Sequence, residues 1–354
     1  MKDIVVCFDG TWNTNADPKD PPTNVERLRR LLANDDSQSV WYDPGVGTDW
    51  YDHLRGGVTG EGLSKNIRQG YVHLSQTWKD GDRIWLFGFS RGAFTARSLA
   101  GMLRKCWLPA NAGDELAEEA YHVYQILAGG ADGPEAVAFR ERNKCREIRI
   151  HFIGVWDTVG ALGIPLPIAK HLNEEFNGFH DTRLSSTVRY AYHAVAIDEH
   201  RADYDVTLWD DVAEPVPDHT VEQRWFAGAH SNIGGGYPDQ QLADITLAWM
   251  IARARQAVSE GFDGGLRIAD PDGSAAVSAT SFQGILRDSY KEFIRIYRVL
   301  HPHFYRAITL GPGSNETIDP SVAKRVDNPP AGQAPYNPQN LFAIGELWRQ
   351  HLGS

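Results

Sequence analysis

The chain has 354 residues, of which 42% are hydrophobic and 23% charged, so it contains enough apolar residues to bury a large core. Its net charge of -11 and the lack of any Lys/Arg cluster interleaved with aromatic residues argue against a nucleic-acid surface. Three cysteines without a CxxC pair give neither a disulfide framework nor a zinc signature. No apolar run approaches the roughly 20 residues needed to cross a bilayer. The N-terminus also has no signal-peptide pattern, so we expect a cytoplasmic protein unless a dedicated secretion system exports it.

The first third of the chain alternates short apolar runs with stretches of helical spacing. The apolar runs predict strands at residues 4–8, 40–42 and 83–89, and the helical spacing predicts helices at 24–32, 60–78 and 93–103. Strands separated by helices indicate βαβ units, in which the strands run parallel.

The middle of the chain continues this pattern with three further apolar runs, at residues 148–156, 189–197 and 223–229. These runs end in Asp157, Asp198 and His230, respectively. The pattern predicts an α/β fold with a mainly parallel central sheet flanked by helices. In such a sheet the polar residues that follow the strands collect at its carboxyl edge.

Two insertions interrupt the alternation, at about residues 107–145, with a helix expected at 114–128, and at about 161–186. Either insertion could cap a site at the carboxyl edge. From about residue 281 a C-terminal extension follows, with an amphipathic helix expected at 282–297 and then a segment rich in Pro, Gly and Asn. Since no interdomain linker is evident, we expect residues 1–354 to form one domain.

The strongest motif is Gly88-Phe89-Ser90-Arg91-Gly92, a G-x-S-x-G sequence between an expected strand and an expected helix. This is the setting of a nucleophile elbow, in which a sharp turn exposes the serine hydroxyl above the sheet edge. Gly88 and Gly92 would remove side chains that collide with the neighbouring strand and helix. The motif therefore predicts a serine hydrolase with Ser90 as its nucleophile.

An oxyanion hole in this fold takes one backbone N–H from the residue after the nucleophile, here Arg91, and one from the loop after an early strand. That loop reads Asp9-Gly10-Thr11, so the Gly10 or Thr11 N–H is the second expected donor. Asp9 would then hold the loop in place. In an alternative interpretation Asp9 is a phosphatase nucleophile of the haloacid dehalogenase kind, but Thr11 stands where the second aspartate of that motif is needed.

A serine nucleophile needs a histidine base, and the base needs an acid to fix its tautomer. His230 is the preferred base because it follows the last predicted strand at the head of a glycine-rich turn. Asp157 and Asp198 both follow suitable strands and both remain possible acids. Topology slightly favours Asp198, whose alternative role is a salt bridge with Arg201 or a helix cap.

Five sequence blocks in order, FDGTWN, GFSRGAFTAR, GVWDTVG, AIDEHR and HSNIGGGY, resemble the DUF2235 family of α/β-hydrolases. This family includes the catalytic domain of the Tle1-type phospholipase effectors of the type VI secretion system. The resemblance implies an α/β-hydrolase fold and a catalytic triad of Ser90, Asp157 and His230, and so favours Asp157 over Asp198. One departure is Asn232, where the family usually has an acidic residue.

These observations predict an esterase or lipase-like hydrolase that cleaves carboxylic esters through an acyl-enzyme, with no cofactor and no metal. A phospholipid substrate, with peripheral membrane contact, is implied by the resemblance alone, and a soluble ester is the next expectation. The Arg91 guanidinium has a second expected role, in binding a phosphate or carboxylate of the substrate. The alternatives are a catalytically silent hydrolase fold used for binding, and an antibacterial effector that depends on an adaptor. The sequence does not fix the oligomeric state.

Overall fold

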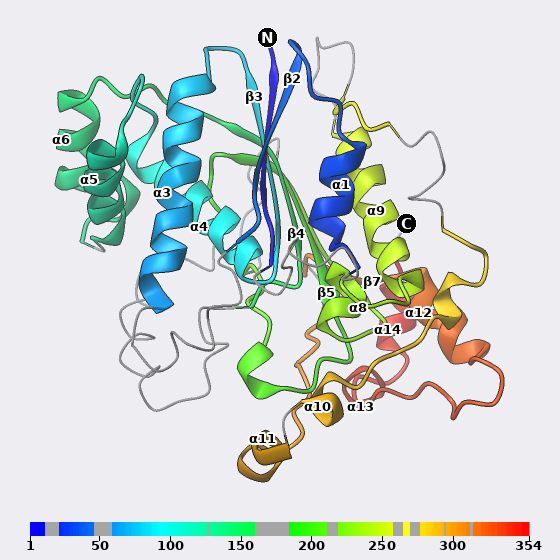
Figure 1. Ribbon diagram of the computed structural model, residues 1–354. Coiled ribbons are helices and arrows are strands. Elements are labelled where there is room, and N and C mark those ends of the chain that lie inside the picture. The colour runs from blue at the N-terminus through cyan, green and yellow to red at the C-terminus, as the bar shows by residue number, and fades with distance from the viewer. Residues whose placement is uncertain are drawn as a thin grey trace.

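A seven-stranded sheet, with every neighbouring pair of strands parallel, forms the centre of the computed structural model (Figure 1). The structure describes residues 1–10, 21–45, 59–126, 128–159, 184–210, 219–257, 265–269, 277–293, 295–311 and 314–353. The strand order is β2-β1-β3-β4-β5-β6-β7. The strands are β1 Asp3–Phe8, β2 Gln38–Asp43, β3 Arg83–Phe89, β4 Ile150–Trp156, β5 Val188–Ala196, β6 Thr220–Phe226 and β7 Glu316–Ile318. This arrangement confirms the predicted α/β class and is consistent with the α/β-hydrolase fold.

Helices cover both faces of the sheet (Figure 1). Helices α3 (Thr59–Thr77) and α4 (Arg91–Cys106) lie on one face, and α1 (Asn24–Leu31) and α9 (Gln241–Gln256) lie on the other. Alternation along the strands explains the two layers, because side chains at even and odd positions point to opposite faces. In β1, Ile4, Val6 and Phe8 join the core with α3 and α4, whereas Val5 and Cys7 join the core with α1.

The insertion at 107–145 forms α5 (Asp114–Gln125), a short 3-10 turn (Gly130–Asp132) and α6 (Pro134–Arg142). It packs outside α3 and α4 as an additional layer, on the left of Figure 1. It contacts α3, where the Gln76 side chain donates to the Ala112 carbonyl at 3.2 Å, and the later part of α4, where the Cys106 thiol meets the Ala120 carbonyl at 3.2 Å. This insertion is therefore a flanking layer and not a cap over the carboxyl edge. The second predicted insertion falls almost wholly outside the described residues, which resume at 184.

The helix predicted at 282–297 is wrong. The segment instead forms a 3-10 turn at Ser281–Gln283, an extended stretch, and two short helices, α10 (Ser289–Glu292) and α11 (Arg295–Leu300). Side chains from elsewhere in the fold bind the carbonyls that a helix would use internally: Arg325 donates to Phe282 and Gly284, and Asn232 donates to Ile285. Tertiary hydrogen bonds thus override the amphipathic pattern.

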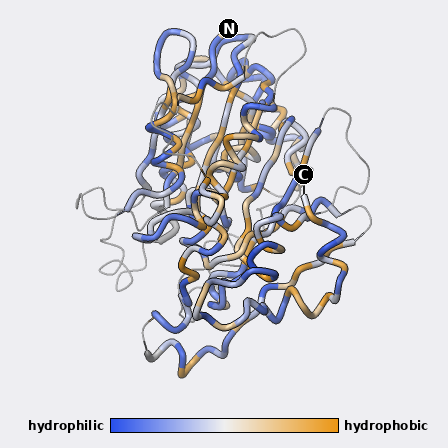
Figure 2. The backbone as a smooth tube through the Cα atoms, turned by 90° about the vertical axis from the view of Figure 1, so that its right-hand side faces the viewer, coloured by the Kyte–Doolittle hydropathy of each residue, from blue (hydrophilic) through white to orange (hydrophobic). Residues whose placement is uncertain are grey.

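The C-terminal region also contributes to the sheet, which the sequence did not predict. Strand β7 extends the sheet beside β6, and α12 (Pro320–Asp327), α13 (Gln339–Phe342) and α14 (Leu347–Gln350) follow it. A third apolar cluster joins this region to β5 and β6, with Trp225, Ile318, Leu341 and Trp348 at 1% exposure or less. Apolar residues gather along the strands while the outer turns are hydrophilic (Figure 2). Within the described part of the chain, none of the helices has the length and apolar content that a membrane span requires.

Candidate active site

Ser90 occupies a sharp turn between β3 and α4. Its backbone φ of 58° and ψ of -121° lie in a region that residues with a side chain rarely adopt. The flanking glycines have a steric reason: a Cβ at Gly92 would lie 2.2 Å from the Phe8 carbonyl oxygen, and one at Gly88 would lie 2.5 Å from the Gly92 oxygen. The turn is therefore possible only because both positions lack side chains, as the motif predicts.

Three buried side chains from three strand ends form one hydrogen-bonded chain. The Ser90 Oγ lies 2.8 Å from His230 Nε2, and His230 Nδ1 lies 2.6 Å from Asp157 Oδ2. Ser90 follows β3, Asp157 follows β4 and His230 follows β6, so all three lie at the carboxyl edge of the sheet. Since an ionised carboxylate can only accept, Nδ1 carries the ring proton and Nε2 is left to accept from the Ser90 hydroxyl.

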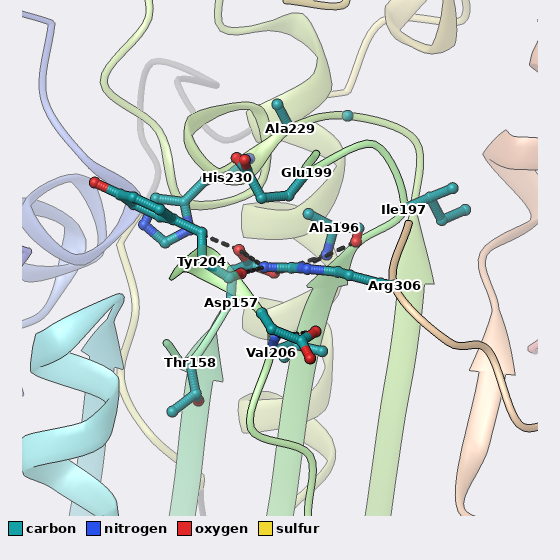
Figure 3. Close-up of polar contacts among 12 residues, drawn as sticks. Asp157, Thr158, Ala196, Ile197, Glu199, Tyr204, Val206, Ala229, His230 and Arg306 are labelled. Carbon is teal, nitrogen blue, oxygen red and sulfur yellow. Dashed lines mark hydrogen bonds and ion pairs between the residues drawn. The ribbon is translucent and has the colours of Figure 1, made fainter. Parts of the chain in front are cut away.

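Asp157 is fully buried, and donors surround both of its carboxylate oxygens (Figure 3). Oδ1 accepts from the Ala196 N–H at 2.8 Å and from Arg306 Nη1 at 2.6 Å, while Oδ2 accepts from His230 and from Arg306 Nη2 at 3.0 Å. Burial on its own would raise the pKa of this carboxyl group. The charge of Arg306 and the hydrogen bonds from His230 and Arg306 outweigh burial and hold the pKa far below its ordinary value.

His230 is held at its backbone and at its ring. It begins the short helix α8 (His230–Gly234), and its backbone N–H lies 3.3 Å from Glu199 Oε2. The Phe89 ring lies 4.7 Å from the imidazole and the Tyr204 ring 5.3 Å from it, centroid to centroid. These contacts fix the ring between the serine and the aspartate.

Asp198, the alternative acid, is bonded elsewhere. Its Oδ2 accepts from the Gly228 N–H at 2.7 Å and from the Tyr336 hydroxyl at 2.8 Å, so it holds the turn that precedes His230. Burial raises the pKa of Asp198. The salt bridge to Arg201, its predicted alternative role, is made by Glu199 instead, with Arg201 Nε at 2.8 Å. Burial opposes ionisation of Glu199, but Arg201 brings its pKa to about 2.

The predicted oxyanion donors are only partly described, since Thr11 lies outside the described residues. Gly10 does lie beside the serine, because a Cβ at Gly10 would be 3.6 Å from the Ser90 Cβ. Its N–H, however, donates to Asp9 Oδ1 at 2.7 Å and does not point to the hydroxyl. Asp9 also accepts from Thr23 Oγ1 and from the Tyr42 hydroxyl, each at 2.7 Å, and so joins this loop to α1 and β2.

Arg91 begins helix α4 directly after the serine. The first N–H groups of a helix have no partner within the helix and carry its positive dipole end. The Arg91 side chain is half-buried beside Tyr204, and burial lowers its pKa to about 10. The guanidinium therefore stays charged at neutral pH.

A family model described as the T6SS phospholipase effector Tle1-like catalytic domain matches residues 2–253. The chain belongs to this family. An uncharacterized protein of Saccharomyces cerevisiae is 32% identical over 228 residues, which cover 57% of this chain and 32% of the yeast protein.

One solved structure supports the same fold. The crystal structure of an uncharacterized protein from Pseudomonas aeruginosa matches 78% of this chain and 49% of its own, with a TM-score of 0.50 and 21% identity. The structure of the Tle1 effector bound to the VgrG spike matches 68% of this chain and 52% of its own, with a TM-score of 0.35 and 19% identity. This Tle1-like chain thus spans about a third of its yeast relative and about half of each solved relative.

Two residues at the site were missed by sequence reasoning. Arg306 lies 149 residues after Asp157, in a segment with no recognisable motif, and only the folded chain brings the two together. Glu199 directly follows Asp198, the alternative acid, in the block AIDEHR. The nearby Arg201 could have indicated that one of these two acidic residues forms an ion pair. Among the described residues, no group of three or more His, Cys, Asp and Glu side chains could hold a metal ion.

Proposed function

We propose that this Tle1-like chain is a serine hydrolase that cleaves a carboxylic ester of a phospholipid. The observation that carries the proposal is the buried hydrogen-bonded chain Ser90–His230–Asp157 at the carboxyl edge of the sheet. Family membership supports the choice of a phospholipid, because the family is named for a phospholipase catalytic domain.

The acylation step follows from these contacts. Ser90 Oγ attacks the ester carbonyl carbon while its proton passes to His230 Nε2, 2.8 Å away. Asp157 stabilises the imidazolium that results and keeps its Nδ1–H in line. The tetrahedral intermediate then collapses, the carbon–oxygen bond to the alcohol breaks, and His230 returns the proton to the leaving oxygen. A fatty acyl chain remains esterified to Ser90.

The deacylation step uses the same base. His230 takes a proton from a water molecule, the resulting hydroxide attacks the acyl carbon, and Ser90 recovers its proton as the fatty acid leaves. Negative charge develops on the carbonyl oxygen in both steps. The Arg91 N–H at the start of α4 is proposed as one donor to this oxygen, and the N–H of Gly10 or Thr11, expected from the sequence, as the second.

The experiment is hydrolysis of phospholipid vesicles, with the products identified by mass spectrometry. Wild type should release a free fatty acid and a lysophospholipid, and Ser90→Ala should release neither. Asp198→Asn is the matched control, because it alters a buried aspartate at the same sheet edge without touching His230 Nδ1. Folded wild type that cleaves neither phospholipids nor p-nitrophenyl esters would contradict the proposal.

A further inference from the structure

The Arg306 side chain is fully buried and forms a bidentate ion pair with the carboxylate of Asp157 (Figure 3). It donates one hydrogen bond to each carboxylate oxygen, at 2.6 and 3.0 Å. Its terminal nitrogens also donate to the Ala196 carbonyl at 3.0 Å and to the Tyr204 carbonyl at 2.5 Å. The planar guanidinium is thereby fixed at both ends, and a bidentate pair of this kind fixes the plane of the carboxylate.

These hydrogen bonds restrict the Asp157 carboxylate to one orientation. Four donors, two from Arg306 and one each from Ala196 and His230, occupy its two oxygens. Rotating the carboxylate to break the contact with His230 would also break both bonds to Arg306. The guanidinium therefore determines where the acid meets the imidazole.

The segment that carries Arg306 is itself anchored beside the active-site loops. The Phe304 N–H donates to the His200 carbonyl at 3.0 Å, and the His200 ring bonds the Phe304 carbonyl at 2.9 Å. The Asn340 side chain bridges the Arg306 and Ile197 carbonyls, at 3.2 and 3.1 Å. Phe304, Arg306 and Asn340 lie beyond residue 253, where the match to the family model ends, whereas His200 and Ile197 lie within it.

We infer that Arg306 is a positioning residue of the catalytic centre, and that the C-terminal segment carrying it belongs to the active site. The inference rests on the proposed function. Arg306 holds Asp157 against His230 Nδ1, and its charge competes with the imidazolium for the same carboxylate. Removing the charge of Arg306 is therefore expected to change the pH profile of serine activation as well as its rate.

Other ionisable groups face this pair and stay in place when Arg306 alone is changed. They are His193 within β5, Glu199, Arg201, Tyr204 and Asp205 in the segment after β5, and Arg91 at the start of α4. A change in pH dependence on substituting Arg306 therefore reports its own charge.

The test uses two variants of the full chain. Arg306→Met removes both the charge and the hydrogen bonds, whereas Arg306→Lys keeps the charge but cannot form the bidentate hydrogen bonds of a guanidinium. Arg325→Met is the matched control, because Arg325 is another buried C-terminal arginine that donates to carbonyls, those of Phe282 and Gly284, away from His230. Three quantities are measured: the fluorophosphonate labelling rate of Ser90 against pH, the pH midpoint of the His230 ring signals by NMR, and the Tm.

We expect Arg306→Met to label at least about tenfold more slowly at its best pH, with the acid limb of the profile and the His230 NMR midpoint moved up by about one pH unit. Arg306→Lys should keep the wild-type His230 NMR midpoint but label more slowly, and Arg325→Met should lower only Tm.

An unchanged labelling rate and an unchanged His230 NMR midpoint in folded Arg306→Met would overturn the inference. If Arg306→Met does not fold, wild-type labelling by Arg306→Lys would overturn it instead. If wild type does not label at all, the proposed function fails, while the NMR midpoint still tests the coupling between Arg306 and His230.

Discussion

The backbone N–H of Ser90 donates to the carbonyl oxygen of Trp156 at 3.0 Å, so the nucleophile turn is tied to the residue that precedes Asp157. Strands β3 and β4 are neighbours, with Phe89 opposite Trp156. Both Ser90 and Asp157 then turn with positive φ, 58° and 41°. The sheet itself thus sets the distance between serine and acid, and His230, from β6, bridges the two.

The two possible acids can be separated by substitution. Asp157→Asn should slow Ser90 labelling by about a thousandfold or more, because an amide no longer fixes the Nδ1–H tautomer. Asp198→Asn should stay within about tenfold of wild type, since Asp198 bonds Gly228 and Tyr336 and not the imidazole. The measurement is the second-order rate of fluorophosphonate labelling. The opposite ranking of the two variants would assign the acid to Asp198.

Asp157→Asn should also destabilise the protein. Removing the carboxylate charge leaves Arg306 buried without its ion-pair partner, which costs about 3 kcal/mol of unfolding free energy. Urea denaturation followed by circular dichroism would measure this cost. The double variant Asp157→Asn with Arg306→Met should recover part of the loss, because no buried charge remains unpaired. If the double variant is less stable by the full sum of the two single effects, the two residues are not coupled.

The backbone at Ser90 predicts an order of stabilities. A φ of 58° strains any residue with a Cβ, so Ser90→Gly should unfold with about 1 kcal/mol more free energy than Ser90→Ala. Both variants lose the nucleophile and should not label. Equal stability of the two, or a less stable glycine variant, would show that the turn stores no strain.

The Arg91 side chain offers a test of substrate class. Its backbone N–H is unaffected by substitution, so Arg91→Ala removes only the side chain of the residue that follows Ser90. We expect Arg91→Ala to raise KM for a phospholipid about tenfold, through loss of a phosphate contact, and to leave KM for an uncharged p-nitrophenyl ester unchanged. Arg91→Lys, which keeps a positive charge, should recover part of the phospholipid effect. Equal losses on both substrates would assign Arg91 a structural role.

Two buried histidines predict how stability depends on pH. Burial lowers the pKa of His151 to about 4, and burial together with the charge of Arg97 lowers that of His193 to about 3. His193 Nε2 accepts from the Thr158 N–H at 3.0 Å, which requires the neutral ring. Below the ordinary value of 6.5 the unfolded chain therefore binds more protons than the folded protein, and the stability present above pH 6.5 is lost as the pH falls.

Each histidine should contribute a slope of about 1.4 kcal/mol per pH unit between pH 6 and 4.5. Urea unfolding at several pH values measures the slope. His193→Gln keeps an acceptor for Thr158 but does not titrate, so its unfolding free energy should vary less steeply with pH than that of wild type. An unchanged slope in His193→Gln would show that His193 is not the group that titrates.

The sequence predicted the sheet well because its signals are local. The apolar runs that end in Ser90, Asp157 and His230 mark buried parallel strands, and glycines at 88 and 92 mark the turn that only a nucleophile elbow requires. Asp157 could be preferred over Asp198 only through family resemblance, because both follow strands that end at the same edge.

The remaining features depend on contacts that are distant in sequence. Strand β7 has three residues and pairs with β6 across about 90 intervening positions, so no local pattern marks it. The helix expected at 282–297 has the right periodicity, but Asn232 and Arg325 bind its backbone in an extended form. Arg306 is one of several arginines in its neighbourhood, and nothing near it in the sequence sets it apart. Such residues could be found only by seeing which carboxylate they meet.

The most direct test of the central claim is to treat the purified full chain with a fluorophosphonate and locate the adduct by peptide mass spectrometry. The account predicts one adduct, on Ser90, that forms in wild type and is abolished in His230→Ala while circular dichroism shows that variant folded. An adduct on another residue, or labelling of Ser90 that is as fast in His230→Ala as in wild type, would contradict the claim that His230 activates Ser90.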